Sequence, residues 1–266
     1  MEIYFISEFI AHDGVRLHYT IQGDGEIPVI CLHCLGADAS SWEGVWNTCG
    51  DSFRWIGLDL RGHGRSSRLL CKMTAEILAR DVLDLADALA LNEFSVAGHS
   101  MGGKVAMRLC ALAPKRILSL ILIGSVGPGP VPLERPVMEN FVSRAHGFLF
   151  VRDFFRPWFR HWPCAEVNAY LAKITITPQW ALKLACEMAI YTDLEKEVGT
   201  LSQPVLLIIG SNDPVYGIEY QQRAVIPHLA NARQVLIPDC GHGLILERPK
   251  EISLQIDLFL VPSLSR

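Results

Sequence analysis

The chain has 266 residues, of which 50% are hydrophobic and 20% charged, and its 24 Lys and Arg against 28 Asp and Glu give a formal net charge of −4. A chain this apolar and this weakly charged can bury a large core, which excludes intrinsic disorder. The slightly acidic balance argues against a nucleic-acid partner, because such binding needs a basic surface that neutralises phosphates. The length alone fits either two ordinary domains or one α/β domain.

The hydropathy of the chain raises the question of a membrane span. The mean hydropathy is high, at +0.25, but the longest apolar stretches, such as Ile117–Val126 and Pro204–Ile209, fall short of the ~18 residues that a spanning helix needs. The first ten residues carry Glu2 and Glu8 and have neither a basic region nor a small-residue cleavage site, so they do not resemble a signal peptide. We therefore expect no membrane span and a cytoplasmic location.

Taken in chain order, the first elements are two β-rich runs, 3–10 and 14–22, separated by His12-Asp13-Gly14, which predicts a hairpin. Short continuous apolar runs follow, and these are typical of strands buried on both faces of a parallel sheet. They are Pro28–Leu32, Arg54–Leu60, Phe94–Ala97, Leu118–Ile123, Val205–Ile209 and Gln234–Ile237.

Helical patterns alternate with these runs. The clearest covers Thr74–Leu91, where apolar residues repeat every three or four positions on one face and Thr74 stands as N-cap. Two further helices are predicted at Met101–Ala113 and from about Pro249 to Leu260. Strands that alternate with helices of this length predict an α/β fold with a mostly parallel sheet.

One stretch, 127–203, breaks the alternation. It begins with Gly127-Pro128-Gly129-Pro130, continues as several short helices, and holds 11 of the 23 aromatic residues of the chain. We expect an inserted lid with an apolar inner face. The alternative is an ordinary helical hairpin that packs its aromatic side chains on the core.

The segment 98–102 is a G-x-S-x-G motif centred on Ser100, and it lies between a predicted strand and a predicted helix. A serine in so sharp a turn has an exposed hydroxyl, and the glycines allow strand and helix to pass closely. The N-terminus of the helix adds free N–H groups beside any oxyanion that forms. This context predicts that Ser100 is a nucleophile; the alternative is a tight structural turn.

A nucleophilic serine needs a base, and the base needs an orienting carboxylate. Asp213 follows the run Val205–Ile209, and His242 follows the run Gln234–Ile237. Both residues therefore lie at the carboxyl edge of the predicted sheet, where open α/β folds place their sites. We predict a catalytic triad of Ser100, Asp213 and His242.

Five blocks resemble the α/β-hydrolase superfamily in sequence and order: HCLG, DLRGHGRS, GHSMGG, GSNDPV and GHGLILERP. The resemblance covers nearly the whole chain. It implies a mostly parallel eight-stranded sheet flanked by helices, with a core of residues 1–126 and 204–266 and a helical cap of residues 127–203.

The same resemblance implies an oxyanion hole formed by the backbone N–H groups of Leu35 and Met101. Cys34 stands where the family usually has Gly, and a side chain at this position restricts the backbone. The residues expected to line the substrate pocket are His33, Cys34, Phe154 and Trp158.

Other motifs favour structural roles. The eight cysteines show no paired spacing, which predicts mostly buried free thiols. Cys31 and Cys34 have C-x-x-C spacing but end a predicted strand, where alternate side chains point to opposite faces, so neither a metal site nor a redox pair is expected. Arg61 and His63 are expected to hold their loop. No nucleotide-binding fingerprint follows a strand, and no cofactor or metal is predicted.

These features together predict a cofactor-free serine hydrolase. A single domain follows because Ser100 precedes the insertion, whereas Asp213 and His242 come after it. The expected substrate is a small ester-like molecule: a carboxylic ester, lactone or thioester with an apolar part. Family members with the same triad are also C–C bond hydrolases, enol-lactonases or perhydrolases, and these activities are the alternatives. A hydrolase-like binding protein with little turnover is the alternative from another class.

Overall fold

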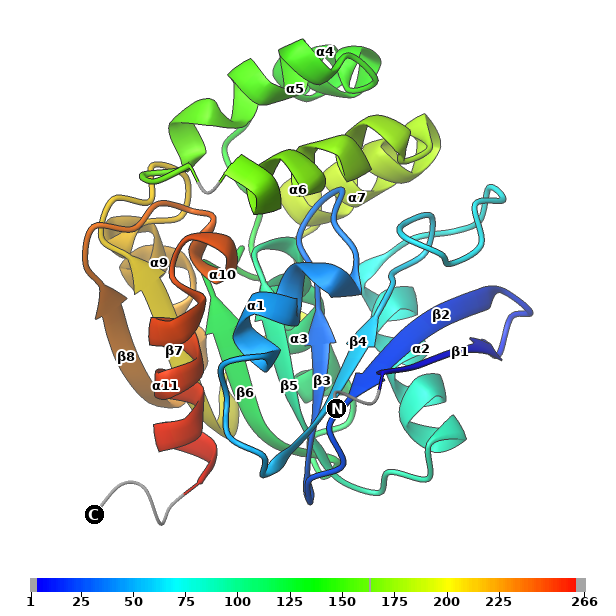
Figure 1. Cartoon of the computed structure of the whole chain (residues 1–266), viewed down its shortest axis with the longest axis vertical. Helices are drawn as coiled ribbons and strands as arrows, with labels where there is room; N and C mark the ends of the chain where they lie inside the picture. The colour runs from blue at the N-terminus through cyan, green and yellow to red at the C-terminus, as the bar shows by residue number, and fades with distance from the viewer. Residues whose placement is uncertain (1–3, 163, 262–266) are drawn as a thin grey trace.

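The computed structural model describes residues 4–162 and 164–261, and the side chains of these except 4–6 and 164. An eight-stranded sheet forms the centre, in the order β1-β2-β4-β3-β5-β6-β7-β8 (Figure 1). β2 is antiparallel to both of its neighbours, β1 and β4, and all other neighbouring strands are parallel. The strands are β1 (Tyr4–Ile10), β2 (Arg16–Gln22), β3 (Ile27–Leu32), β4 (Phe53–Leu58), β5 (Phe94–His99), β6 (Ile117–Ile123), β7 (Leu201–Gly210) and β8 (Leu229–Ile237). Residue 3 of the first predicted run lies outside the described residues.

Helices cover both faces of the sheet, as the predicted α/β fold requires (Figure 1). The α-helices are α1 (Glu43–Trp46), α2 (Ala75–Ala88), α3 (Met101–Leu112), α4 (Arg135–Arg144), α5 (Phe148–Phe155), α6 (Cys164–Ile176), α7 (Gln179–Tyr191), α8 (Glu195–Val198), α9 (Ile218–Ala224), α10 (Leu244–Glu247) and α11 (Pro249–Leu260). Short 3-10 helices are η1 (Ala39–Trp42), η2 (Arg156–Trp158) and η3 (Ile226–His228).

The central strands are buried on both faces, which explains their continuous apolar runs. In β6, Leu122 joins the core beneath α2 and α3, whereas its neighbour Ile121 joins the core beneath α1 and α11. Each face therefore receives every second side chain of the strand.

Several element ends differ from the predicted ones. β4 ends at Leu58 rather than Leu60, because the chain leaves the sheet at Asp59, whose carboxylate accepts hydrogen bonds from the N–H groups of Ala39 and Arg65 at 2.8 and 2.9 Å. β8 begins well before the predicted run, because this outer strand has mostly exposed side chains and so lacks a continuous apolar pattern. The prediction that Thr74 is the N-cap of α2 is confirmed, because Thr74 Oγ1 accepts a hydrogen bond from Ile77 N–H.

Helices α4–α8 follow β6 and precede β7, and they form the helical insert of the fold. Figure 1 shows α4–α7 above the carboxyl ends of the strands. Aromatic side chains of the insert, among them Phe141, Phe155 and Tyr170, form an apolar cluster that includes Cys34 from the loop after β3. The apolar face of the insert is thus turned toward the sheet edge.

A buried lysine joins the insert to the core. Lys104 Nζ, from α3, donates hydrogen bonds to the carbonyl oxygens of Gly129, Ala189 and Thr192 at 3.1, 3.1 and 2.5 Å. Its side chain is fully buried, and burial lowers the pKa of Lys104 from its ordinary 10.5 to about 8. The sequence provided no signal for this role.

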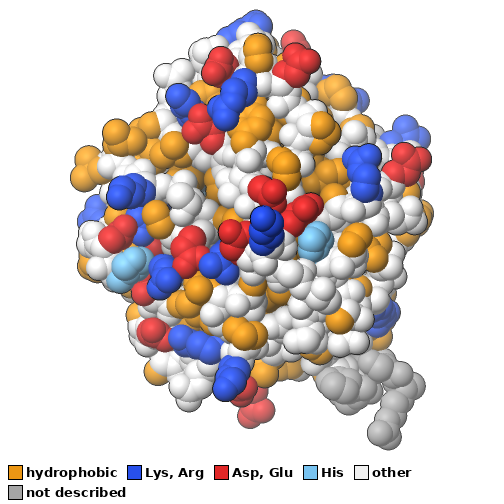
Figure 2. Space-filling view, turned by 180° about the vertical axis from the view of Figure 1, so that it is seen from behind, with side chains coloured by type: hydrophobic (Ala, Val, Ile, Leu, Met, Phe, Trp, Pro, Cys, Tyr) orange, Lys and Arg blue, Asp and Glu red, His pale blue; other side chains and the backbone are white. Residues whose placement is uncertain are grey.

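One face of the molecule carries mixed charge. On the face shown in Figure 2, acidic and basic side chains are interspersed among apolar ones. Among the helices of the described residues, none combines the length and apolar character needed to cross a bilayer.

The seven cysteines whose side chains are described have free thiols, five of them buried. The prediction of mostly buried free thiols is confirmed for these seven, and the thiol of Cys164 lies outside the described residues. Cys31 packs in the core beneath α1 and α11, whereas Cys34 packs in the cluster of the insert, so the C-x-x-C pair does not converge.

Candidate active site

Ser100 stands at a sharp turn between β5 and α3. Its backbone has φ 53° and ψ −115°, a strained combination for a residue other than glycine. Neighbouring glycines make the turn sterically feasible: a Cβ at Gly98 would lie 2.6 Å from Gly103 Cα, and one at Gly102 would lie 2.3 Å from the carbonyl oxygen of Leu32. The G-x-S-x-G motif therefore has the strand–turn–helix context that exposes a serine hydroxyl.

The three predicted triad residues form one hydrogen-bonded chain. Ser100 Oγ lies 3.0 Å from His242 Nε2, and His242 Nδ1 lies 2.8 Å from Asp213 Oδ2. The other carboxylate oxygen, Asp213 Oδ1, accepts hydrogen bonds from the N–H groups of Val215 and Tyr216 at 2.8 and 2.9 Å. Because the residues follow β5, β7 and β8, the parallel sheet delivers all three to its carboxyl edge.

Electrostatics favours an ionised Asp213. Burial raises the pKa of this carboxyl, but the adjacent His242 and the backbone donors of Tyr216 and Val215 outweigh burial and hold the pKa below its usual value. The neighbouring His99 is different: burial, followed by repulsion from His242, lowers its pKa to about 3. His99 is therefore a neutral ring, which donates from Nε2 to the carbonyl oxygen of His242 at 3.1 Å.

The two predicted oxyanion donors lie beside Ser100. Met101 is the first residue of α3, and Leu35 and Ser100 line the same cavity. Within the described residues, neither backbone N–H has a hydrogen-bond acceptor. Cys34 does not disturb this loop, because the positive φ of 69° belongs to Gly36, while Cys34 is outside the left-handed region.

Ser100 lies between two cavities. The smaller measures about 30 Å³ and the larger about 200 Å³. Of the predicted pocket residues, Cys34 lines the smaller cavity, Phe154 the larger, and Trp158 both. The larger is lined almost entirely by apolar side chains, many of them from the insert.

The fourth predicted pocket residue, His33, requires a correction, because it lines neither cavity. Its Nδ1 lies 2.7 Å from the carbonyl oxygen of Cys34, and its Nε2 accepts a hydrogen bond from Leu60 N–H at 3.0 Å. Burial lowers the pKa of His33. Both ring nitrogens of a neutral imidazole are thus used to join the loops after β3 and β4.

Sequence reasoning missed Tyr216 and Tyr170. The ring of Tyr216 packs edge-on against His242 with centroids 5.3 Å apart, and it lines the larger cavity. The hydroxyl of Tyr170 donates to the carbonyl oxygen of Leu35 at 3.1 Å, which helps to fix the loop that carries this predicted oxyanion donor. The only sequence signal was the position of Tyr216 three residues after Asp213.

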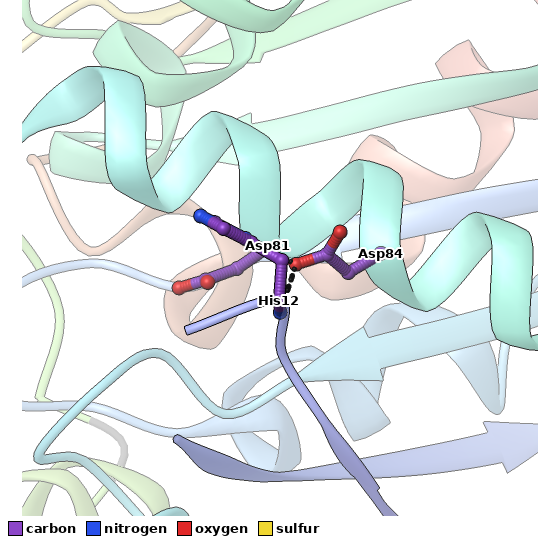
Figure 3. A group of neighbouring side chains, drawn as sticks. All are labelled: His12, Asp81 and Asp84. Carbon is purple, nitrogen blue, oxygen red and sulfur yellow. Dashed lines mark hydrogen bonds and ion pairs between the residues drawn. The ribbon is translucent and has the colours of Figure 1, made fainter. Parts of the chain in front are cut away.

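A group of ionisable side chains outside this site has the donor types of a metal centre. His12, Asp81 and Asp84 lie together between the β1–β2 turn and α2 (Figure 3). However, both oxygens of Asp81 accept hydrogen bonds from Arg61, at 2.7 and 2.6 Å, and Asp13 binds the same guanidinium. Arg61 already neutralises the central carboxylate, so Asp81 and Asp13 hold Arg61 and with it the loop after β4.

Comparisons with known proteins show which proteins this chain is similar to. The pimeloyl-(acyl-carrier protein) methyl ester esterase of Nitrosomonas europaea is 30% identical over 88% of this chain and 96% of its own length. A 2-hydroxy-6-oxononadienedioate/2-hydroxy-6-oxononatrienedioate hydrolase of Paraburkholderia xenovorans is 26% identical over 93% of this chain and 92% of its own. The structure of a hydrolase from Pseudomonas aeruginosa PA01 superposes with a TM-score of 0.83 at 25% identity, covering 96% of this chain and 98% of that one.

Another relative is longer than this chain. The dihydrolipoyllysine-residue acetyltransferase component of the acetoin cleaving system of Pseudomonas putida is 26% identical over 91% of this chain. The present chain spans only 65% of the length of that relative. The family model described as the alpha/beta hydrolase fold matches residues 27–187. Since that match covers more than half of the chain and includes the serine turn, the protein belongs to the alpha/beta hydrolase family.

Proposed function

We propose that this protein is a serine hydrolase that cleaves neutral carboxylic esters with an apolar acyl group through an acyl-enzyme. The observation that carries the proposal is the hydrogen-bonded chain from Asp213 through His242 to Ser100, which ends where two largely apolar cavities meet. The relative from Nitrosomonas europaea, named as a methyl ester esterase, supports the same type of reaction.

In the first half of the reaction, Ser100 Oγ attacks the ester carbonyl carbon while His242 Nε2 takes the hydroxyl proton. The negative charge moves to the carbonyl oxygen, which accepts hydrogen bonds from the N–H groups of Met101 and Leu35. When the tetrahedral intermediate collapses, the bond to the alcohol oxygen breaks. His242 gives its proton to that oxygen, and the acyl group stays on Ser100.

In the second half, a water molecule takes the place of the alcohol beside His242. His242 Nε2 removes a proton from the water, whose oxygen attacks the acyl carbon. The second intermediate collapses by breaking the bond to Ser100 Oγ, which recovers the proton, and the carboxylic acid leaves. Asp213 remains ionised throughout and holds the ring so that Nε2 faces Ser100.

A neutral substrate is favoured by the cavity walls. Among the described residues that line the two cavities, there is no Lys or Arg. The substrate named for the Paraburkholderia relative is a dioate, with two carboxylates. A carboxylate buried without a cationic partner carries a desolvation penalty of several kcal/mol. The walls thus favour a neutral ester over the C–C bond hydrolase alternative.

Replacing Ser100 by Ala tests the proposal. The wild-type protein is expected to hydrolyse methyl esters and to label with a fluorophosphonate probe, whereas Ser100→Ala should lose both, with kcat reduced by roughly 10⁴-fold or more. Ser143→Ala, on the exposed side of α4, is the matched control and should retain both activities.

Two results would contradict the proposal. Labelling that persists in Ser100→Ala would exclude this serine as the nucleophile. A wild-type protein that neither labels nor hydrolyses would favour the binding-protein alternative.

A further inference from the structure

The two cavities that meet at Ser100 differ greatly in size. The smaller has about 30 Å³ and the larger about 200 Å³. Leu35, Ser100, Phe155 and Trp158 line both, so these residues lie where the two cavities adjoin. An ester bound to Ser100 must therefore place its acyl and alcohol parts in spaces of unequal volume.

The position of His242 decides which part enters which cavity, provided that the proposed function holds. His242 and Gly243 line only the smaller cavity, whereas Met101, one of the two predicted oxyanion donors, lines only the larger, and the other donor, Leu35, lines both. The alcohol oxygen must receive its proton from His242 Nε2 and so lies on the His242 side of Ser100. The alcohol part therefore occupies the smaller cavity, and the acyl part the larger.

The smaller cavity limits the alcohol to very few atoms. A single water needs about 10–15 Å³ of such space, so about 30 Å³ holds roughly two non-hydrogen atoms. Its walls include Phe159, Tyr170 and Ile245, which are 5%, 8% and 1% exposed. Methanol, with one carbon and one oxygen, fits this volume, whereas a longer alcohol meets packed side chains.

The larger cavity suits an apolar chain of moderate length. A cavity of about 150 Å³ lined by apolar side chains holds benzene, which has six carbons. The cavity here is somewhat larger, at about 200 Å³, and its walls include Phe141, Cys186 and Ala189 from the insert. Its outer rim includes Leu133 and Val137, which are 36% and 44% exposed.

We infer that the enzyme is selective for esters of a small alcohol, methanol in particular, with apolar acids of about six to eight carbons. The selectivity arises from the unequal division of space on the two sides of Ser100. A long alcohol would have to pass from the smaller cavity into the outer groove with which it shares Ser41, Tyr170, Ile245 and Leu246. Those four side chains line both spaces and so lie at the boundary that a long alcohol would have to pass.

A pair of isomeric esters tests the inference. Methyl heptanoate and hexyl acetate have the same atoms, but the first has its long chain on the acyl side and the second on the alcohol side. One methylene in an apolar pocket is worth about 10-fold or more in kcat/KM. We therefore expect methyl heptanoate to be preferred by at least about tenfold in kcat/KM.

Two variants test the division of the site, one by reducing the volume of the larger cavity and the other by increasing the volume of the smaller. Ala189→Leu fills the larger cavity and should lower kcat/KM for methyl heptanoate by about tenfold more than it lowers kcat/KM for methyl acetate. Ala172→Leu, on an exposed position of α6, is its control. Ile245→Ala enlarges the smaller cavity and should raise the relative rate on hexyl acetate, whereas Ile256→Ala, an equally buried change outside both cavities, should not.

The outcomes separate the inference from the proposed function. Equal rates on the two isomers, or a preference for hexyl acetate, would overturn the division of the site but leave serine hydrolysis intact. If neither ester is cleaved and the fluorophosphonate does not label Ser100, both the inference and the proposed function fail.

Discussion

Replacing Asp213 by Asn tests how the site sets the tautomer of His242. In the native site, Oδ1 accepts hydrogen bonds from the N–H groups of Val215 and Tyr216, and Oδ2 lies 2.8 Å from His242 Nδ1. Asparagine has one acceptor oxygen, and the two backbone donors will hold it at the Oδ1 position. The amide NH₂ then faces His242 Nδ1, which must accept. The ring proton consequently moves to Nε2, where it faces Ser100 Oγ.

A ring protonated at Nε2 has no lone pair for the serine proton, so we expect a large loss of activity with little change in stability. The corresponding substitution in a serine protease lowers kcat by about 10⁴-fold, or ~5.5 kcal/mol in activation free energy, and the same tautomer change operates here. The assay is kcat/KM on methyl heptanoate, with thermal unfolding as a check of folding. Asp153→Asn, an exposed change in the insert, is the control. A loss of less than about tenfold in Asp213→Asn would refute the proposed control of the tautomer.

Two further substitutions test the packing around the site. Lys104→Met leaves three carbonyls without this donor, two of them buried, and should lower the free energy of unfolding. The pKa of Lys104 is about 8 in the folded protein and has its ordinary value of 10.5 in the unfolded chain. Between pH 8 and pH 10.5 the unfolded chain therefore binds more protons than the folded protein. The contribution of Lys104 to the free energy of unfolding consequently rises with pH in this range. The difference between wild type and variant in denaturant unfolding should grow by about 2 kcal/mol from about pH 7.5 to about pH 9.5, and a constant difference would contradict the lowered pKa. Gly102→Ala places a Cβ 2.3 Å from the carbonyl oxygen of Leu32 and should cost about 1–3 kcal/mol, measured as a lower melting temperature. Gly50→Ala, where a Cβ meets no atom within 4 Å, should be nearly neutral, and an equal effect at both positions would argue against the steric explanation.

The elements that the sequence predicts best are those buried on both faces. The run that became β6 is apolar at successive positions, because Ile121 and Leu122 enter opposite cores. The serine turn is equally recognisable, since the glycines at 98 and 102 are required by contacts within a few residues or with the adjacent strand. β8 was only partly recognised, because at the edge of the sheet its side chains are mostly exposed and carry no continuous apolar pattern.

Features that depend on residues far away along the chain cannot be predicted from the local sequence pattern. His33 lies close in sequence to the predicted oxyanion donor Leu35 and is predicted to line the pocket, but its ring accepts a hydrogen bond from the N–H of Leu60, 27 positions further along the chain. Lys104 finds its three carbonyl acceptors 25, 85 and 88 positions away. The volumes of the two cavities cannot be predicted from the sequence either, because they depend on how side chains from the insert and the core pack together.

The insert is a structural part of the candidate active site, and this bears on how the proposed specificity would arise. The N–H of His242 donates to the carbonyl oxygen of Trp158 at 2.6 Å, and the Trp158 ring packs edge-on against the His242 ring with centroids 5.3 Å apart. Arg160 and His161, which follow in the insert, both contact Asp239 in the loop that carries His242. A hinged opening of the insert would break these contacts and those of Lys104 together. Trp158 thus both contacts His242 and lines the two cavities. A substitution of Trp158 that alters the shape of either cavity would therefore also alter the position of the proposed base.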